Sequence, residues 1–76
     1  SQKEIRTETL IQHFRLRQGL NKQAYAQRFG LPAEADFGPA LSALTKRGLL
    51  EEDGEWMRPT PLGFYLNNEI GLALVD

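Results

Sequence analysis

The chain has 76 residues, of which 41% are hydrophobic and 25% charged; this length excludes a catalytic barrel or a nucleotide-binding sheet, and we expect one domain from a longer protein. Cysteine is absent, which excludes disulfides and metals held by cysteine. The longest apolar stretch, residues 72–75, is too short to span a membrane, so we expect a cytoplasmic protein. The net charge of −1 is uneven, since residues 1–30 carry +4 and residues 31–76 carry −5.

The first part of the chain predicts two helices. Apolar residues recur at helical spacing over residues 3–18, and Gly19 is a plausible stop. Asn21 is a good N-cap for a second helix over residues 22–29. Gly30 fits the left-handed residue that ends such a helix.

A third helix is predicted over residues 37–47. Asp36 is its expected N-cap, which places Pro39 in the first turn, where the missing N–H does no harm. Gly48 follows the helix, and a contact between Leu49 and Leu44 would complete a Schellman stop.

After the third helix the pattern changes to short strands. Residues 49–52 and 55–58 predict a hairpin, because Asp53 and Gly54 tolerate the positive φ angles of a type I′ turn. Pro59 is expected to end the second strand.

A last helix is predicted to begin with Thr60 as N-cap and Pro61 at its first position. Gly63 either weakens this helix or permits close packing on the hairpin, and residues 71–76 fray or leave the helix. Its apolar stripe is Leu62, Leu66, Ile70 and Leu74. The expected fold is mainly α with a small β-hairpin, a single winged-helix-like domain over residues 1–76 in the order helix-helix-helix-hairpin-helix.

The side chains argue against duplex DNA as the partner of such a domain. The presumptive recognition helix opens with Asp36 and Phe37, where base readout needs Arg, Lys, Asn or Gln. The hairpin carries four carboxylates that would repel phosphates: Glu51, Glu52, Asp53 and Glu55. We therefore expect a protein-docking or structural module.

The spacing of several motifs resembles the C-terminal domain of the oxygen-independent coproporphyrinogen III oxidase family, which includes heme chaperones. The resemblance covers about residues 8–70. Its most telling segment is an apolar helix face followed by Arg15, Leu16, Gly19 and Leu20. The other matching positions are Glu8, Leu10, Phe14, Tyr25, Phe29, Gly30, Leu41, Leu44, Gly48, Leu49, Leu50, Thr60, Gly63, Leu66, Asn67 and Ile70.

The resemblance implies that catalysis belongs to an upstream radical S-adenosylmethionine barrel with a four-iron four-sulfur cluster. This segment would carry no catalytic residue, metal or cofactor, would have no activity alone, and would pack beside the barrel and help shape the porphyrin site. The parent protein would be an oxidoreductase of heme biosynthesis. Whether it is an oxidase, a heme chaperone or a heme-degrading relative depends on residues outside this segment. A stand-alone winged-helix transcription regulator or protein-docking module remains the alternative.

Four residues are candidates for substrate or domain contacts. Arg15 and Arg17 would pair with propionates or with the barrel. Because they are two residues apart on a predicted helix, they do not share a face. The alternative is that each forms an ordinary salt bridge. Tyr25 matches an aromatic position of the family. Trp56 is either a core residue or an interface anchor.

Two further side chains have weaker patterns. Met57 should face the opposite side of the hairpin from Trp56. His13 is the only histidine, and it is either an ordinary partly buried residue or a heme ligand without a partner ligand in the sequence.

Overall fold

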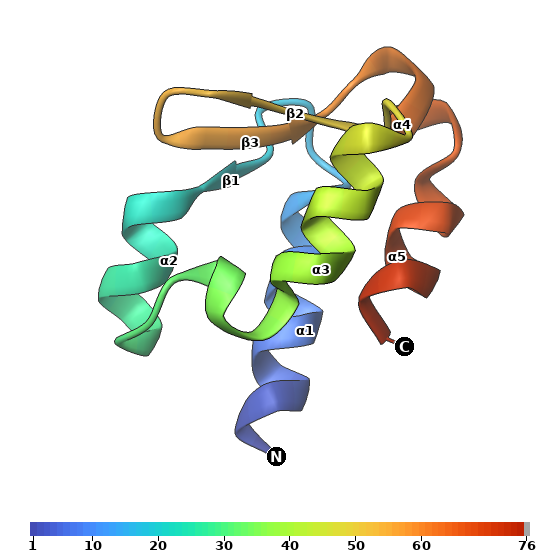
Figure 1. The fold of residues 1–76 in the computed structure, drawn as a ribbon. Helices are drawn as coiled ribbons and strands as arrows, with labels where there is room; N and C mark the ends of the chain where they lie inside the picture. Colours follow the sequence, from blue (N-terminus) through green and yellow to red (C-terminus); the bar gives the residue numbers. More distant parts are fainter. Residues whose placement is uncertain (76) are drawn as a thin grey trace.

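The computed structural model describes residues 1–75, in which helices surround one core and a small sheet closes one end (Figure 1). The sheet is antiparallel, with strand order β1-β3-β2. In chain order the elements are α1 (Gln2–His13), β1 (Leu20–Asn21), α2 (Lys22–Phe29), α3 (Ala33–Lys46), β2 (Leu50–Asp53), β3 (Trp56–Pro59), α4 (Pro61–Tyr65) and α5 (Asn67–Val75). The predicted class, mainly α with a small hairpin, is confirmed, whereas the winged-helix label stays a prediction.

The first helix is shorter than predicted. α1 ends at His13 instead of residue 18, and Phe14 is its C-cap. The side-chain amide of Asn67 donates to the Phe14 carbonyl at 2.8 Å, so α5 occupies the acceptor at which α1 stops. Arg15 and Arg17 therefore lie in the turns after the helix and not on it.

The second helix has the predicted bounds. Asn21 accepts a hydrogen bond from the backbone N–H of Ala24 at 2.9 Å, and Gly30 ends the helix with φ at 75°. Both signals are local, because each cap lies within a few residues of the groups that it satisfies.

The third helix begins earlier than predicted. α3 starts at Ala33, and its N-cap Pro32 offers no side-chain hydrogen bond. The predicted cap, Asp36, lies in the first turn and accepts instead from Arg6 Nε at 2.6 Å. Pro39 consequently lies inside the helix, where it lacks the N–H for one helical hydrogen bond.

The end of α3 is the predicted Schellman stop. The Gly48 N–H bonds the Thr45 carbonyl at 3.0 Å, and the Leu49 N–H bonds the Leu44 carbonyl at 2.9 Å. Gly48 adopts φ of 79°, which glycine tolerates without strain.

The sheet differs from the predicted hairpin in two ways. A third strand, β1, pairs Leu20 with Met57, and a two-residue strand of this kind exists only through its partner. The turn lies at Gly54 and Glu55, because Asp53 pairs with Trp56. Gly54 has φ of 62° and Glu55 has negative φ, as in a type II′ and not a type I′ turn.

The predicted last helix is two helices with a break at Leu66, whose φ and ψ are −100° and 41°. Thr60 caps α4 as predicted and accepts from the Gly63 N–H at 3.0 Å. A Cβ at Gly63 would overlap the carbonyl oxygen of Leu49, so this glycine does permit close packing just before β2. α5 continues to Val75, without the predicted fraying of residues 71–75, and residue 76 lies outside the described residues.

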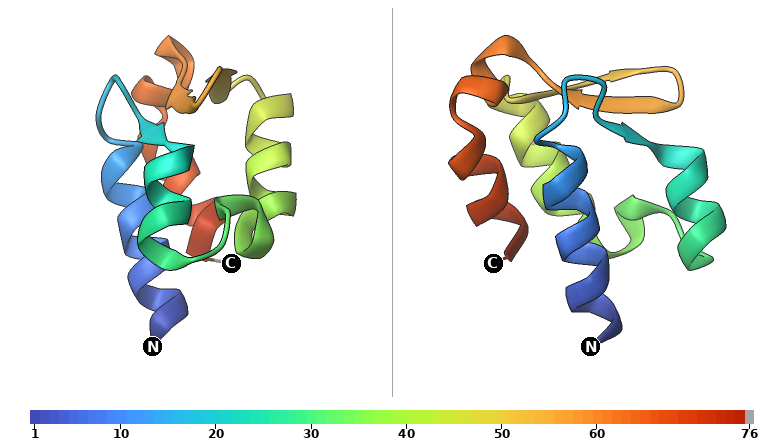
Figure 2. Two further views of the ribbon diagram at one scale, coloured as in Figure 1. Left: turned by 90° about the vertical axis from the view of Figure 1, so that its left-hand side faces the viewer. Right: turned by 180° about the vertical axis from the view of Figure 1, so that it is seen from behind.

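The core lies beneath the sheet, between α1, α3 and α5 (Figure 2). α5 packs on both α1 and α3, whereas α4 lies at the end of β3 and contacts α5. No helix among residues 1–75 has the length and hydrophobicity to cross a membrane. The buried hydrophobic residues are Leu10, Phe14, Leu20, Tyr25, Ala33, Phe37, Leu41, Leu44, Leu49, Leu50, Met57, Ile70 and Leu74.

Candidate functional site

Arg15 lies at the edge of a groove between α1 and α5. Its side chain is exposed, and among residues 1–75 it forms no salt bridge. The groove has a volume of about 370 Å³ and combines apolar walls with two amides. Its lining is Ile11, Arg15, Asn67, Asn68, Gly71, Leu72 and Val75. A guanidinium beside an apolar wall suits a ligand that is apolar with an anionic edge.

Arg17 faces a different neighbour. Its guanidinium carbon lies 5.4 Å from the centre of the Phe64 ring, within the range of a cation–π contact. The two residues border a depression of about 310 Å³ whose other walls are Pro59, Thr60 and Pro61. The turn after α1 thus directs its two arginines toward two separate parts of the surface.

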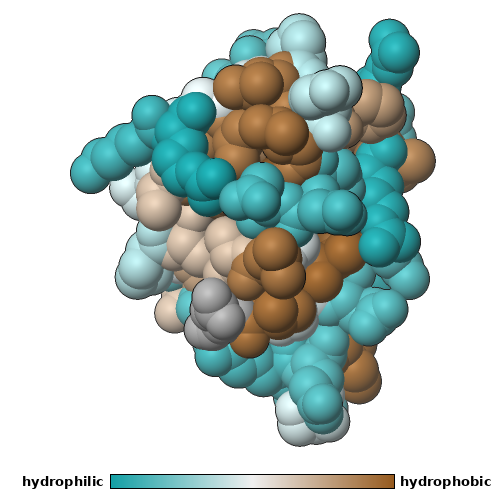
Figure 3. All heavy atoms as spheres, turned by 90° about the vertical axis from the view of Figure 1, so that its right-hand side faces the viewer, coloured by the Kyte–Doolittle hydropathy of each residue, from teal (hydrophilic) through white to brown (hydrophobic). Residues whose placement is uncertain are grey.

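The surface beside these arginines is unusually apolar. In Figure 3, hydrophobic side chains gather in patches on the side of the molecule where α4 and α5 lie, separated by hydrophilic atoms. The exposed large hydrophobic residues of this side are Leu62, Phe64, Tyr65, Leu66, Leu72 and Val75. The sequence pattern placed Leu62 and Leu66 in a buried stripe, whereas only Ile70 and Leu74 of that stripe are buried.

Tyr25 packs in the core and also lines a small cleft between α1 and α2. Only 3% of it is exposed, and its ring packs against Phe29 with 4.8 Å between the ring centres. Its hydroxyl oxygen is buried without a hydrogen-bond partner among the described residues. Burial raises the pKa of this hydroxyl, while the charge of Arg6 opposes that shift.

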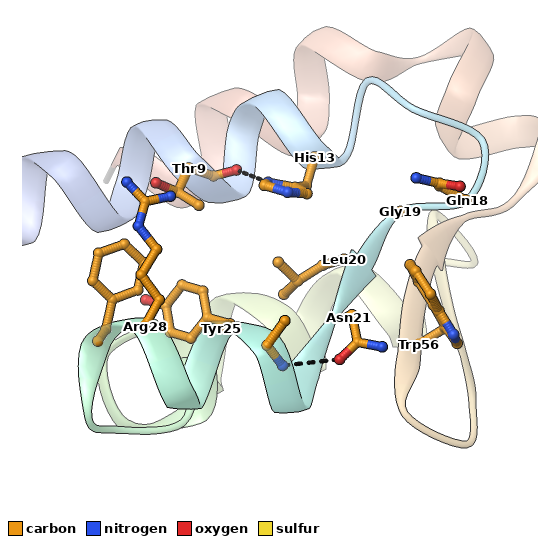
Figure 4. Close-up of a pocket in the computed structure, with 11 residues that line it drawn as sticks. Thr9, His13, Gln18, Gly19, Leu20, Asn21, Tyr25, Arg28 and Trp56 are labelled. Atoms are coloured by element: carbon orange, nitrogen blue, oxygen red, sulfur yellow. Dashed lines mark hydrogen bonds between the residues drawn. The ribbon is translucent and has the colours of Figure 1, made fainter.

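Trp56 lies at one end of a cleft between α1 and α2 (Figure 4), and Met57 is the hairpin residue that packs in the core. The cleft has a volume of about 180 Å³, and His13 and Arg28 also line it. His13 Nδ1 lies 2.8 Å from the Thr9 carbonyl oxygen, a contact within α1. Trp56 therefore lies on a part of the surface separate from Arg15 and Arg17.

The acidic hairpin is partly neutralised within the domain. Lys22 pairs with Glu52, and Arg58 pairs with Asp53 at 3.2 Å. The hydrogen bond to Glu52 raises the pKa of Lys22. Within residues 1–75 no cluster of three or more His, Asp or Glu side chains is placed to hold a metal ion.

Comparison with known proteins identifies the domain itself. No curated protein and no solved structure matches the chain. The sequence model of the HemN C-terminal domain matches residues 1–66, from the start of the chain through α4. HemN-family parents use S-adenosylmethionine and iron–sulfur clusters, but this chain has no cysteine with which to hold such a cluster. The predicted resemblance is thereby confirmed: the chain belongs to the family of C-terminal domains of HemN-type radical S-adenosylmethionine proteins.

Proposed function

We propose that this chain is the non-catalytic C-terminal accessory domain of a cytoplasmic coproporphyrinogen III oxidase-like protein of heme biosynthesis. In that protein the catalytic barrel carries the cluster, which supplies the radical chemistry by cleaving S-adenosylmethionine. The accessory domain packs beside the barrel and helps shape the porphyrin site.

The observation that carries this proposal is the groove between α1 and α5. Ile11, Leu72 and Val75 provide apolar walls, and Arg15 stands at the rim with no carboxylate partner among the described residues. A tetrapyrrole has the complementary chemistry, because its macrocycle is apolar and its propionates are anionic. Arg pairs with carboxylates through two parallel hydrogen bonds, which would orient as well as hold a propionate.

The charge arrangement gives less support to a stand-alone DNA-binding regulator. Lys22 and Arg58, the cations nearest the hairpin, are already paired with hairpin carboxylates. Glu51 and Glu55 remain exposed there. DNA affinity depends on free cations that neutralise phosphates, and this end of the domain offers a surplus of anions.

The test is amide hydrogen exchange on the full-length parent protein with and without coproporphyrin III. We expect porphyrin to slow exchange in residues 11–17 and 67–75, and Arg15→Gln to weaken porphyrin binding about tenfold, the effect of losing a charge-assisted hydrogen bond. Arg28→Gln is the matched control, since Arg28 is exposed but lies on α2, away from this groove. Unchanged exchange in both segments would exclude the porphyrin role.

A further inference from the structure

α4 forms an exposed apolar ridge, which consists of Leu62, Phe64, Tyr65 and Leu66. Successive residues of a helix are rotated by about 100°, so Tyr65 projects opposite Gly63, the one buried residue of α4. Tyr65 is 84% exposed. Leu62 and Leu66 lie on one flank of this crest and Phe64 on the other. Contiguous exposed apolar residues, aromatic ones above all, mark interaction surfaces.

The ridge is held rigidly by backbone contacts. Gly63 sits against the Leu49 carbonyl with no room for a side chain. The Thr60 hydroxyl donates to the Gly48 carbonyl and accepts from the Gly63 N–H. These contacts fix a helix of five residues that would not hold its shape alone. Because this anchoring uses no ridge side chain, a partner can contact the exposed parts of all four without disturbing it.

The charges beside the ridge indicate what kind of partner fits. Arg17 lies over Phe64 and forms no salt bridge among residues 1–75. None of the four ridge residues is charged. A symmetric interface pairs the same patch on both subunits, so a second copy of this ridge would offer Arg17 no carboxylate. The complementary surface is an apolar groove with a carboxylate at its edge.

We propose that the α4 ridge docks into such a groove on the catalytic part of the same parent chain, with a carboxylate of that part opposite Arg17. This inference rests on the proposed function and adds the surface and the chemistry of its partner. HemN-type parents place the domain and the catalytic part in one chain, and all four ridge residues lie within the matched residues 1–66. A covalent link gives a high effective concentration, so four residues with Arg17 suffice for docking.

The experiment uses the full-length parent with a benzophenone photo-cross-linking residue at position 65. We expect an intramolecular cross-link to the catalytic part, mapped by mass spectrometry to a segment containing Asp or Glu. Position 5 is the matched control, because Ile5 is 48% exposed, like Leu62 at 49%, but lies on α1. It should cross-link at no more than a tenth of the yield.

A second measurement needs no photo-reactive residue. In the parent, Tyr65→Asp should speed amide exchange in residues 61–66 at least tenfold, whereas Ile5→Asp should leave that exchange within twofold. Because Tyr65 is so exposed, its substitution removes few contacts within the domain itself.

The outcomes separate this inference from the proposed function. Cross-links between two chains would identify a second copy as the partner and overturn the inference. Cross-linking from position 56 but not from position 65 would overturn docking by the ridge. The domain would then dock on the catalytic part through the surface that contains Trp56. If neither position cross-links and Tyr65→Asp leaves exchange unchanged, the ridge inference fails, and the exchange experiment with coproporphyrin III then decides the proposed function separately.

Discussion

The hairpin tip and the α4 ridge lie at opposite ends of β3 and expose opposite chemistry (Figure 1). The tip carries Glu51, Glu52, Asp53 and Glu55, and two of these carboxylates are paired with cations of the domain. The ridge exposes Leu62, Phe64, Tyr65 and Leu66, and none of these residues is charged. The charged side chains of the tip are well solvated by water, whereas the ridge exposes apolar side chains that a partner would cover.

The hairpin and the ridge are nevertheless each held by a glycine that lies directly against the backbone of another segment. A Cβ at Gly19 would overlap the carbonyl oxygen of Met57 in β3, as one at Gly63 would overlap that of Leu49. Close backbone approach thus fixes the position of each region, and the side chains then decide whether it faces solvent or a partner. Stability and surface chemistry should therefore separate experimentally.

The largest effect should come from the anchor of the ridge. Gly63→Ala forces a methyl group into the Leu49 carbonyl, and we expect a loss of about 3 kcal/mol or more in the free energy of unfolding, measured by urea denaturation. Gly71→Ala is the matched control, because its Cβ would meet open space. That helical substitution should stabilise by up to about 1 kcal/mol. Equal stability of the two variants would contradict the close approach.

A smaller effect is expected from the buried hydroxyl of Tyr25 on α2. Tyr25→Phe removes a hydroxyl that has no hydrogen-bond partner among the described residues, so unfolding free energy at neutral pH should rise by about 1 kcal/mol. The pKa of Tyr25 is raised by burial, so its neutral form favours the fold and stability falls as pH rises above 10.0.

Phe at position 25 should therefore flatten the alkaline part of the stability curve, measured by urea denaturation between pH 8 and pH 11. A marked destabilisation by this substitution would show instead that the Tyr25 hydroxyl contributes a favourable interaction.

The smallest effect should come from the charges of the hairpin tip. Glu52→Gln breaks the exposed pair with Lys22, and we expect a loss of about 0.5 kcal/mol that disappears in 1 M salt. Glu52 raises the pKa of Lys22, so the contribution of the pair is present below pH 10.5 and is lost as pH rises through the raised value. A loss independent of salt and pH would contradict this interpretation.

The accuracy of the sequence-based prediction follows the range of each signal. α2 has its predicted bounds because Asn21 and Gly30 act on groups within a few residues. The Schellman end of α3 and the Thr60 cap of α4 were predictable for the same reason. The start of α3 was mispredicted because Arg6, thirty residues away, takes the Asp36 carboxylate from its expected capping role.

The candidate site was only partly predictable. Arg15 was selected from a family motif and Arg17 as a second basic residue of the predicted first helix, but their placement in a turn depends on the contact between Asn67 and Phe14. The ridge was missed because one continuous helix would bury Leu62 and Leu66 with Ile70 and Leu74. The break at Leu66 instead turns the first two toward solvent and keeps the last two in the core.

The sequence by itself determined the helical class, the caps at Asn21, Gly48 and Thr60, the charged hairpin and the family, because each depends on neighbouring residues or on spacing along the chain. The tertiary structure decided where α1 stops, the pairing of β1, the break between α4 and α5, and which apolar residues remain exposed. Those features depend on backbone groups and charges that meet only after distant segments have packed together.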